Sequence, residues 1–339
     1  MAAKMARSRE SGKAYRDRLI RLLALGPSRP SELSWRARWR ALGRTGGELV
    51  QDNLTDRAAV LTYYGMLAVF PGMLVLVAGL SLFGGSATSS VIEGIESMTF
   101  GPTQQIITEG IASLQASRRQ AGIVAAISLV IAFYSAAGYV GAFMRAANAI
   151  YDVPEGRPAW KTLPLRFLIT IVTGLFLAFS ALVVVFTGRL ATQVGQLMGI
   201  APERIRAFDI AKWPLLALAF GLLVALLYWA APNARQGGFR WITPGSLLAT
   251  LVWVAASGGF AYYVSHFDSY NQTYGTLGGV VIFLVWMWLT NVAVLIGAEF
   301  DAELARERAI ASGLPPRSEP YLPLRDVPVD EVVQQHADI

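Results

Sequence analysis

Six long apolar runs constrain this chain more than any other feature of its sequence. Each run approaches the roughly 20 residues that an α-helix needs to cross about 30 Å of hydrocarbon. None alternates like a membrane-barrel strand, and only a helix satisfies its own backbone hydrogen bonds where water is absent. The six predicted crossings are residues 58–83, 121–147, 165–188, 213–231, 242–264 and 276–300. The sequence therefore predicts an all-α, polytopic membrane protein with six transmembrane helices.

Charged residues are scarce and lie almost entirely outside these runs. The chain is 54% hydrophobic and 15% charged, whereas an ordinary soluble domain is about 25% charged. Only Glu299 among the acidic residues falls within a run, at its end, and only Arg145 among the basic residues lies well inside one. A charge in hydrocarbon costs at least ~2.5–3.5 kcal/mol, so this segregation supports the membrane assignment.

Lysine and arginine residues predict the orientation of the helices. Thirteen of them occur from the N-terminus through Arg57, before the first run, and others follow the second, fourth and sixth runs. The loop 266–275 has none, although the segment 189–212 carries several against the trend. Because such residues collect on the cytoplasmic side, we expect both termini in the cytoplasm.

Three regions follow from this pattern. Residues 1–51 form a basic N-terminal region, 52–308 the membrane domain, and 309–339 a proline-rich tail that we expect to be disordered. Apolar residues in the outer loop 89–119 recur at helical spacing on both sides of a Gly-Pro pair, which predicts two short helices over the outer mouth.

The N-terminal region contains an amphipathic pattern. Trp35 and Trp39 are one helical turn apart and are interleaved with Arg36 and Arg40. This pattern predicts an interfacial helix with its tryptophans in the bilayer and its arginines on anionic headgroups. A solvated basic tail is the alternative.

The residues that common enzyme sites require are missing from the sequence. There is no cysteine and there are two histidines, which excludes disulfides, thiolate zinc sites and multi-histidine metal clusters. No nucleophile–base pair or carboxylate pair is evident, and the glycine patterns lack the lysine of a phosphate-binding loop. We therefore expect no enzymatic activity, cofactor, metal ion or nucleic-acid partner.

A small set of polar residues at membrane depth forms the candidate site. Arg145 and Asn148 lie near the end of the second run, and Asn291 and Glu299 share a broad face of the sixth. Arg145 either extends to the inner headgroups or meets an anionic substrate or the Glu299 carboxylate. Asn291 either joins two helices by hydrogen bonds or lines a pathway, and Glu299 is either an interfacial carboxylate or part of the site.

Two further features are candidates for function. Pro71 frees a backbone carbonyl in the first run and is a candidate helix hinge, with irregular packing as the alternative. The outer loop between the fifth and sixth runs gathers polar side chains that either sit at the interface or line the mouth of a cavity. The members of this candidate cluster are His266, Asp268, Asn271 and Tyr274.

Three stretches resemble the YihY/BrkB family of bacterial integral membrane proteins: DRAAVLTYYGMLAVFPGMLVL, AAGYVGAFMRAANAIYDVPEGRPAWKTLPLRF and SYNQTYGTLGGVVIFLVWMWLTNVAVLIGAEFDAE. The resemblance covers residue 52 to about residue 308. It implies a six-helix protein of the bacterial inner membrane without a settled activity; members have been called ribonuclease BN, virulence factors and transporters. The positions that match the family pattern are Tyr63, Tyr64, Pro71, Tyr274, Gly275, Gly278, Trp286, Gly297 and Glu299.

The sequence supports two functional hypotheses. The first is a transporter or exporter of an unidentified anionic or lipid-like substrate, because polar groups are kept on otherwise apolar helices. The second is a scaffold or partner protein of the envelope that transports nothing. Ribonuclease activity finds no support in a chain without a metal-binding cluster. A homo-oligomer is compatible with the sequence.

Overall fold

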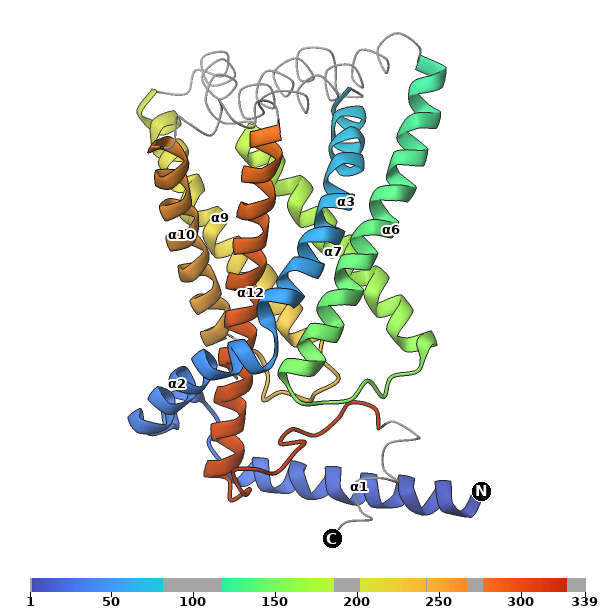
Figure 1. The fold of residues 1–339 in the computed structure, drawn as a ribbon, viewed down its shortest axis with the longest axis vertical. Coiled ribbons are helices and arrows are strands. Elements are labelled where there is room, and N and C mark those ends of the chain that lie inside the picture. Colours follow the sequence, from blue (N-terminus) through green and yellow to red (C-terminus); the bar gives the residue numbers. More distant parts are fainter. Residues whose placement is uncertain (1, 82–117, 186–201, 242, 267–276, 328–339) are drawn as a thin grey trace.

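The computed structural model describes residues 2–81, 118–185, 202–241, 243–266 and 277–327, and within these ranges the chain is helical without strands. Figure 1 shows long helices side by side in a bundle, with two helices crossing one end. The helices are α1 (Ala2–Leu25), α2 (Trp35–Gln51), α3 (Leu54–Ser81), α6 (Arg118–Ile150), α7 (Ala159–Val185), α9 (Pro202–Ala230), α10 (Thr243–His266) and α12 (Leu277–Ala311), with short 3-10 helices η1 (Pro30–Glu32) and η2 (Phe239–Trp241). The predicted all-α fold is confirmed.

Five of these helices are long and apolar enough to cross a membrane, and they lie within α6, α7, α9, α10 and α12. The second to sixth predicted crossings correspond to them. The first predicted crossing corresponds to α3, which lies beside α6 and α12 but is not among the five. A crossing by α3, and with it the total of six, therefore stays a prediction, as do the outer helices of the loop 89–119, almost all of which lies outside the described residues.

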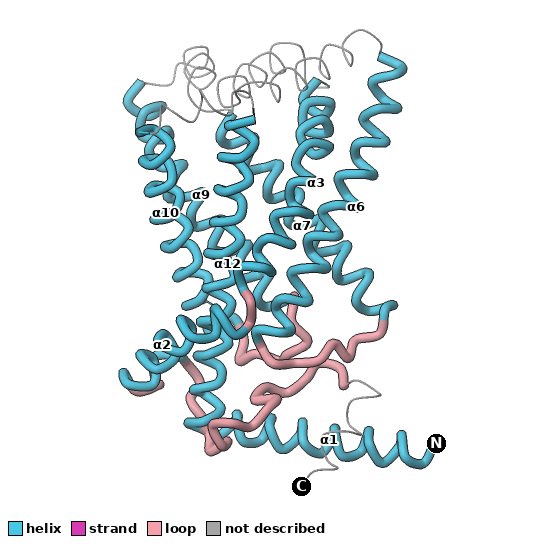
Figure 2. The backbone as a smooth tube through the Cα atoms, viewed as in Figure 1, coloured by secondary structure: helices cyan, strands magenta, loops and turns pink. Residues whose placement is uncertain are grey.

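The two ends of the bundle differ. We call the end that carries α1, α2 and residues 312–327 the basal end, and the end where α6 begins and α10 finishes the distal end (Figure 2). Most buried side chains lie in the basal half. On α6, Tyr134 is 79% exposed whereas Phe143 is fully buried, and on α9 Ile210 is 68% exposed whereas Tyr228 is 1% exposed.

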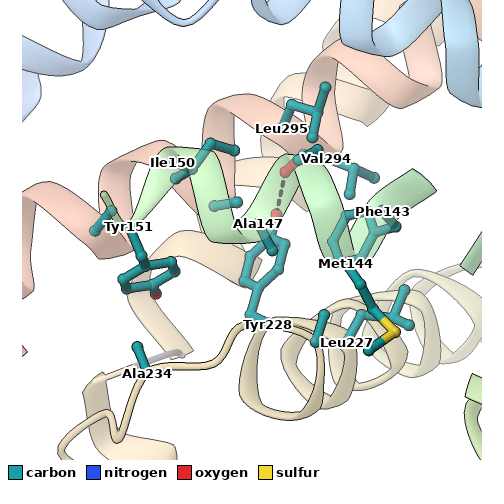
Figure 3. Close-up of a cluster of buried hydrophobic side chains, with 14 of the residues drawn as sticks. Phe143, Met144, Ala147, Ile150, Tyr151, Leu227, Tyr228, Ala234, Val294 and Leu295 are labelled. Atoms are coloured by element: carbon teal, nitrogen blue, oxygen red, sulfur yellow. Dashed lines mark hydrogen bonds between the residues drawn. The ribbon is translucent and has the colours of Figure 1, made fainter. Parts of the chain in front are cut away.

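Aromatic and aliphatic side chains of three helices form the centre of this basal core (Figure 3). The rings of Phe143 on α6 and Tyr228 on α9 are stacked, with their centroids 6.4 Å apart. The Tyr228 hydroxyl donates a hydrogen bond to the carbonyl of Val294 on α12. A buried hydroxyl needs such a partner, and this bond ties α9 to α12.

Helix α2 crosses the basal end and has two different faces. Ser34 caps it, accepting a hydrogen bond from the Ala37 amide at 3.1 Å. Ala37 and Ala41 pack with Trp241 in a second small core, whereas Trp35 and Trp39 are exposed. The predicted amphipathic helix is therefore present, with its tryptophans facing away from the protein.

The structure corrects the prediction that the whole tail after residue 308 is disordered. Helix α12 continues to Ala311, and through Val327 the chain packs under the bundle as an extended segment. Tyr321 and Leu322 are buried in the basal core, and the Arg235 amide donates to the Pro323 carbonyl at 2.7 Å. The prolines prevent a helix here, but two large apolar side chains provide enough burial to hold the segment in place.

Candidate functional site

Asn291 joins three helices of the bundle. Its side chain is 2% exposed. The hydroxyl of Tyr139 on α6 donates to its Oδ1 at 2.8 Å, and its Nδ2 donates to the Thr62 hydroxyl on α3 at 3.0 Å. The Thr62 hydroxyl in turn donates to the Ala58 carbonyl at 2.8 Å. Of the two sequence interpretations of Asn291, this geometry fits the structural one.

Four acidic side chains follow Asn291 on α12, and each is at most 2% exposed: Glu299, Asp301, Glu303 and Glu307. Burying an ionised carboxylate is costly unless charges or donors compensate it. The hydrogen bonds and ion pairs of these four carboxyl groups therefore show which of them stabilise the fold.

Glu303 and Glu307 are paired with arginines of α2. Arg44 contacts Glu303 through Nε and Glu307 through a terminal nitrogen at 2.8 Å. Arg40 contacts Glu307 at 2.8 Å. Burial opposes the charge of Arg44, but the two carboxylates outweigh it and raise the pKa of Arg44. These ion pairs hold α2 against α12. Arg40, which was predicted to contact lipid headgroups, is therefore paired with a carboxylate of the protein itself.

Asp301 lies at the closest crossing of α10 and α12. Its Oδ1 accepts a hydrogen bond from the Gly245 amide at 2.7 Å, in the first turn of α10. A Cβ atom at Gly245 would overlap the Gly297 carbonyl and the Asp301 carboxyl, so the crossing requires glycine. An amide at a helix N-terminus lacks an intrahelical acceptor, which explains a carboxylate at this position. The second oxygen, Oδ2, has no hydrogen-bond partner among the described residues.

Glu299 differs from Glu303 and Glu307 because, like Asp301, it has no basic side chain paired with it among the described residues. Its Oε2 lacks a hydrogen-bond partner within the described ranges. The carboxyl of Asp52, at the C-cap of α2, lies close to that of Glu299. Two carboxyl groups that lie close together repel each other when both are ionised. Burial raises the pKa of Asp52, which Arg57 opposes and Glu48 reinforces.

A second acidic group lies at the same end. Asp152, in the turn after α6, pairs with Arg306 of α12 at 2.6 Å. Burial and the nearby carboxylate of Glu319 raise its pKa to about 6, against the opposing charge of Arg306. Asp152 is therefore a carboxyl group at the basal end whose pKa lies close to neutral.

The other predicted membrane-depth residues lie apart from Glu299. The Arg145 side chain is exposed on α6 whereas Glu299 is buried, and no ion pair joins them among the described residues, so the exposed position fits the interpretation in which Arg145 extends to the headgroups. Asn148 is buried, but its Nδ2 donates to Glu155 at 2.9 Å and its Oδ1 accepts from the Asn233 amide at 2.7 Å. Asn148 thus connects α6 to the turn after it and to the end of α9.

The remaining candidates are placed only in part. Helix α3 continues through Pro71, and His266 is the last residue of α10. Asp268, Asn271 and Tyr274 lie outside the described residues. The hinge and the outer cluster therefore stay predictions. Among the described residues, no group of three or more His, Asp or Glu side chains is arranged to hold a metal ion.

Sequence reasoning missed Asp52 as a neighbour of Glu299. Glu299, Asp301 and Glu303 stand at every second position near the end of the last membrane helix. Acidic residues are unusual at membrane depth, so this spacing was a usable signal of a site there. Asp52 gave no signal, since its approach to α12 depends on how α2 folds back over the bundle.

Known proteins are similar to this chain over most of its length. The profile of the family described as Virulence factor BrkB matches residues 45–321. The ribonuclease-like protein YfkH of Bacillus subtilis is 26% identical over 274 residues, covering 78% of this chain and 94% of the relative. A UPF0761 membrane protein of Pseudoalteromonas translucida is 29% identical over 76% of this chain and 83% of its own length, and one of Alkalilimnicola ehrlichii is 31% identical over 78% and 59%. No solved structure is significantly similar.

Proposed function

Starting from the membership of this chain in the BrkB family of multi-pass membrane proteins, we propose that it transports an anionic or lipid-like substrate across the bacterial inner membrane. The observation that carries the proposal is the Glu299 carboxyl, which is 2% exposed, has an oxygen without a hydrogen-bond partner among the described residues and lies near the half-buried Asp52 carboxyl. Ionisable groups kept at membrane depth without a structural partner mark ion, proton or substrate pathways.

In this proposal the carboxyl pair takes up and releases a proton during transport. A shared proton keeps the pair at one negative charge while it is buried, and its loss would place two negative charges side by side. The second charge would strain the contact between α2 and α12. A proton can thereby be coupled to a movement of the basal end.

The orientation belongs to the same proposal. The basal end faces the cytoplasm, because α1, α2 and the loops at this end carry the excess of basic residues. The exposed rings of Trp35 and Trp39 rest at the level of the lipid headgroups, where tryptophan is preferred. Arg36, which is exposed beside them, contacts anionic headgroups.

The test is transport by proteoliposomes with Glu299→Gln, which keeps the shape of the side chain and removes its proton exchange. Two probes represent the proposed classes: fluorescently labelled phosphatidylglycerol for a lipid-like substrate and carboxyfluorescein for an anionic solute. We expect wild-type protein to move one probe under a pH gradient and Glu299→Gln to reduce the rate at least about tenfold. Glu203→Gln, at an exposed position at the start of α9, is the matched control. Equal rates in wild type and Glu299→Gln would contradict the proposal.

A second candidate function is a scaffold of the envelope. It is favoured by the number of basal polar groups engaged in structural contacts, such as Asn291, Asn148 and the arginines of α2. Chemical cross-linking in cells followed by mass spectrometry distinguishes the two functions. A stable partner at α2 together with no movement of either probe would favour the scaffold.

A further inference from the structure

A basic pocket opens at the basal end, away from the Glu299–Asp52 pair. Its volume is about 740 Å³, within the range of small-molecule sites. Four parts of the chain line it: α1, the first turn of α7, the end of α9 with the turn that follows, and the C-terminal segment. The lining residues are Arg16, Lys161, Trp229, Arg235, Gln236, Arg325 and Asp326.

Positive charge dominates this pocket. Four basic side chains and a single carboxylate line it. That carboxylate, Asp326, contacts Lys161 at 2.6 Å. Arg16 lies 3.6 Å from Asp17, a neighbour on the same helix whose side chain is 56% exposed. Such an exposed contact compensates little charge.

The two other arginines have no carboxylate partner among the described residues. Arg325 donates to the backbone carbonyls of Ala234 and Trp229 and lies over the Trp229 ring, 5.5 Å from its centroid. Arg235 is exposed, and its side chain makes no hydrogen bond or ion pair within the described ranges. Burial lowers the pKa of Arg325, and the like charges of Arg157 and Arg235 lower it further. Basic side chains that repel one another and that keep unused N–H donors indicate a site for an anion.

The position of the pocket indicates what kind of anion can reach it. Trp229, at the end of α9, is 43% exposed, and Trp160, next to Lys161, is 70% exposed. Exposed tryptophans at the ends of apolar helices lie at the level of the phosphates of a bilayer. The pocket is also much larger than a phosphate ion, so it has room for the group to which a phosphate is esterified.

We propose that this basal basic pocket binds a phosphate ester, held by Arg16, Arg235 and Arg325 against the face of Trp229. Guanidinium groups suit phosphate because they offer paired donors in a plane. The ester is either the headgroup of an anionic phospholipid that enters from the inner leaflet or a soluble phosphate ester from the cytoplasm. Binding at equilibrium does not require transport, so this proposal stands or falls independently of the proposed function.

The test measures binding to full-length protein in an uncharged detergent by isothermal titration calorimetry. Short-chain phosphatidylglycerol probes the lipid source and glycerol 3-phosphate the soluble source, with short-chain phosphatidylcholine as a lipid without net charge. The critical variant is Arg235→Glu, because the side chain lines the pocket and holds no structural contact. Arg240→Glu is the matched control, an equal charge change at an exposed basal position that does not line the pocket.

We expect saturable binding of phosphatidylglycerol or of glycerol 3-phosphate, whichever source is correct, and weaker binding of phosphatidylcholine. Arg235→Glu should weaken that binding at least about tenfold, since it removes a charge-assisted contact and adds repulsion, while Arg240→Glu should leave it unchanged. Arg16→Gln provides an independent second variant with a smaller loss. If neither probe saturates, or if Arg235→Glu and Arg240→Glu weaken binding equally, the pocket is not the site.

Discussion

The basal and distal halves of the bundle are built from the same helices but packed differently. In the basal half, hydrogen bonds, ion pairs and large buried side chains connect α2, α6, α9 and α12. In the distal half, large apolar side chains of α6, α7 and α9 are exposed along the described residues. Stability follows the density of such contacts. From this comparison we expect the basal half to be more rigid than the distal half, whose exposed apolar side chains meet lipid rather than protein.

The largest effect is expected where α10 crosses α12. Gly245→Val would force its side chain into the Gly297 backbone and the Asp301 carboxyl, so we expect a loss of more than about 4 kcal/mol or no folded protein. Gly258→Val makes the same change in the distal half of α10, where nothing lies within 4 Å of the added Cβ, and should have little effect. Thermal unfolding in detergent measures both. Similar losses would contradict the difference in packing.

The ion pairs between α2 and α12 should show the next largest effect. Arg44→Ala leaves the buried carboxylates of Glu303 and Glu307 short of a partner, so we expect about 3–5 kcal/mol of destabilisation. Arg36→Ala removes an exposed arginine of the same helix and should change the free energy of unfolding by less than about 0.5 kcal/mol. Urea unfolding measures the free energy of unfolding of both variants. A small effect of Arg44→Ala would show that these ion pairs do not hold α2 against α12.

Asn291→Leu should have an intermediate effect. The change leaves the Tyr139 hydroxyl without its acceptor and the Thr62 hydroxyl without its donor, at about 1–3 kcal/mol. A double-mutant cycle with Tyr139→Phe should give a coupling of about 1 kcal/mol. Tyr134→Phe, at an exposed distal position of α6, is the matched control and should show no coupling to Asn291.

The smallest effect is the pH dependence due to Asp152. Burial and the nearby carboxylate of Glu319 raise its pKa from 3.8 to about 6 in the folded state. The folded state thus holds this proton more tightly, so the group favours folding at low pH and loses that contribution as the pH rises from about 4 to 6. Glu319, Asp52, Glu48 and Arg306 surround it. Asp152→Asn should flatten this part of the stability profile; an unchanged profile would assign the effect to another group.

Much of the fold could be predicted from the sequence because hydrocarbon imposes simple rules on composition. Five of the six predicted crossings correspond to helices that are long and apolar enough to cross a membrane, and the family resemblance, which rested on motifs in the first, second and last runs, is confirmed. The site was less predictable. Which way Arg145 points depends on the rotation of α6, and the partners of Glu303 come from α2, more than 250 residues earlier.

The tail shows the same limit. Its prolines and low hydrophobicity argued for disorder, yet Tyr321 and Leu322 are buried in the basal core together with side chains of α6, α9 and α12. A sequence pattern indicates the conformation that a segment prefers on its own. It does not indicate which other segment of the folded chain will pack against it.

Distances between spin labels test the difference between the two halves most directly. The chain has no cysteine, so introduced cysteines are labelled specifically. Two pairs on the same two helices are matched: Arg145→Cys with Leu247→Cys at the basal end, and Val130→Cys with Ala261→Cys at the distal end, all at exposed positions. In lipid nanodiscs we predict one narrow distance distribution for the basal pair and a broad or multiple distribution for the distal pair. Equally narrow distributions for both pairs would contradict the account.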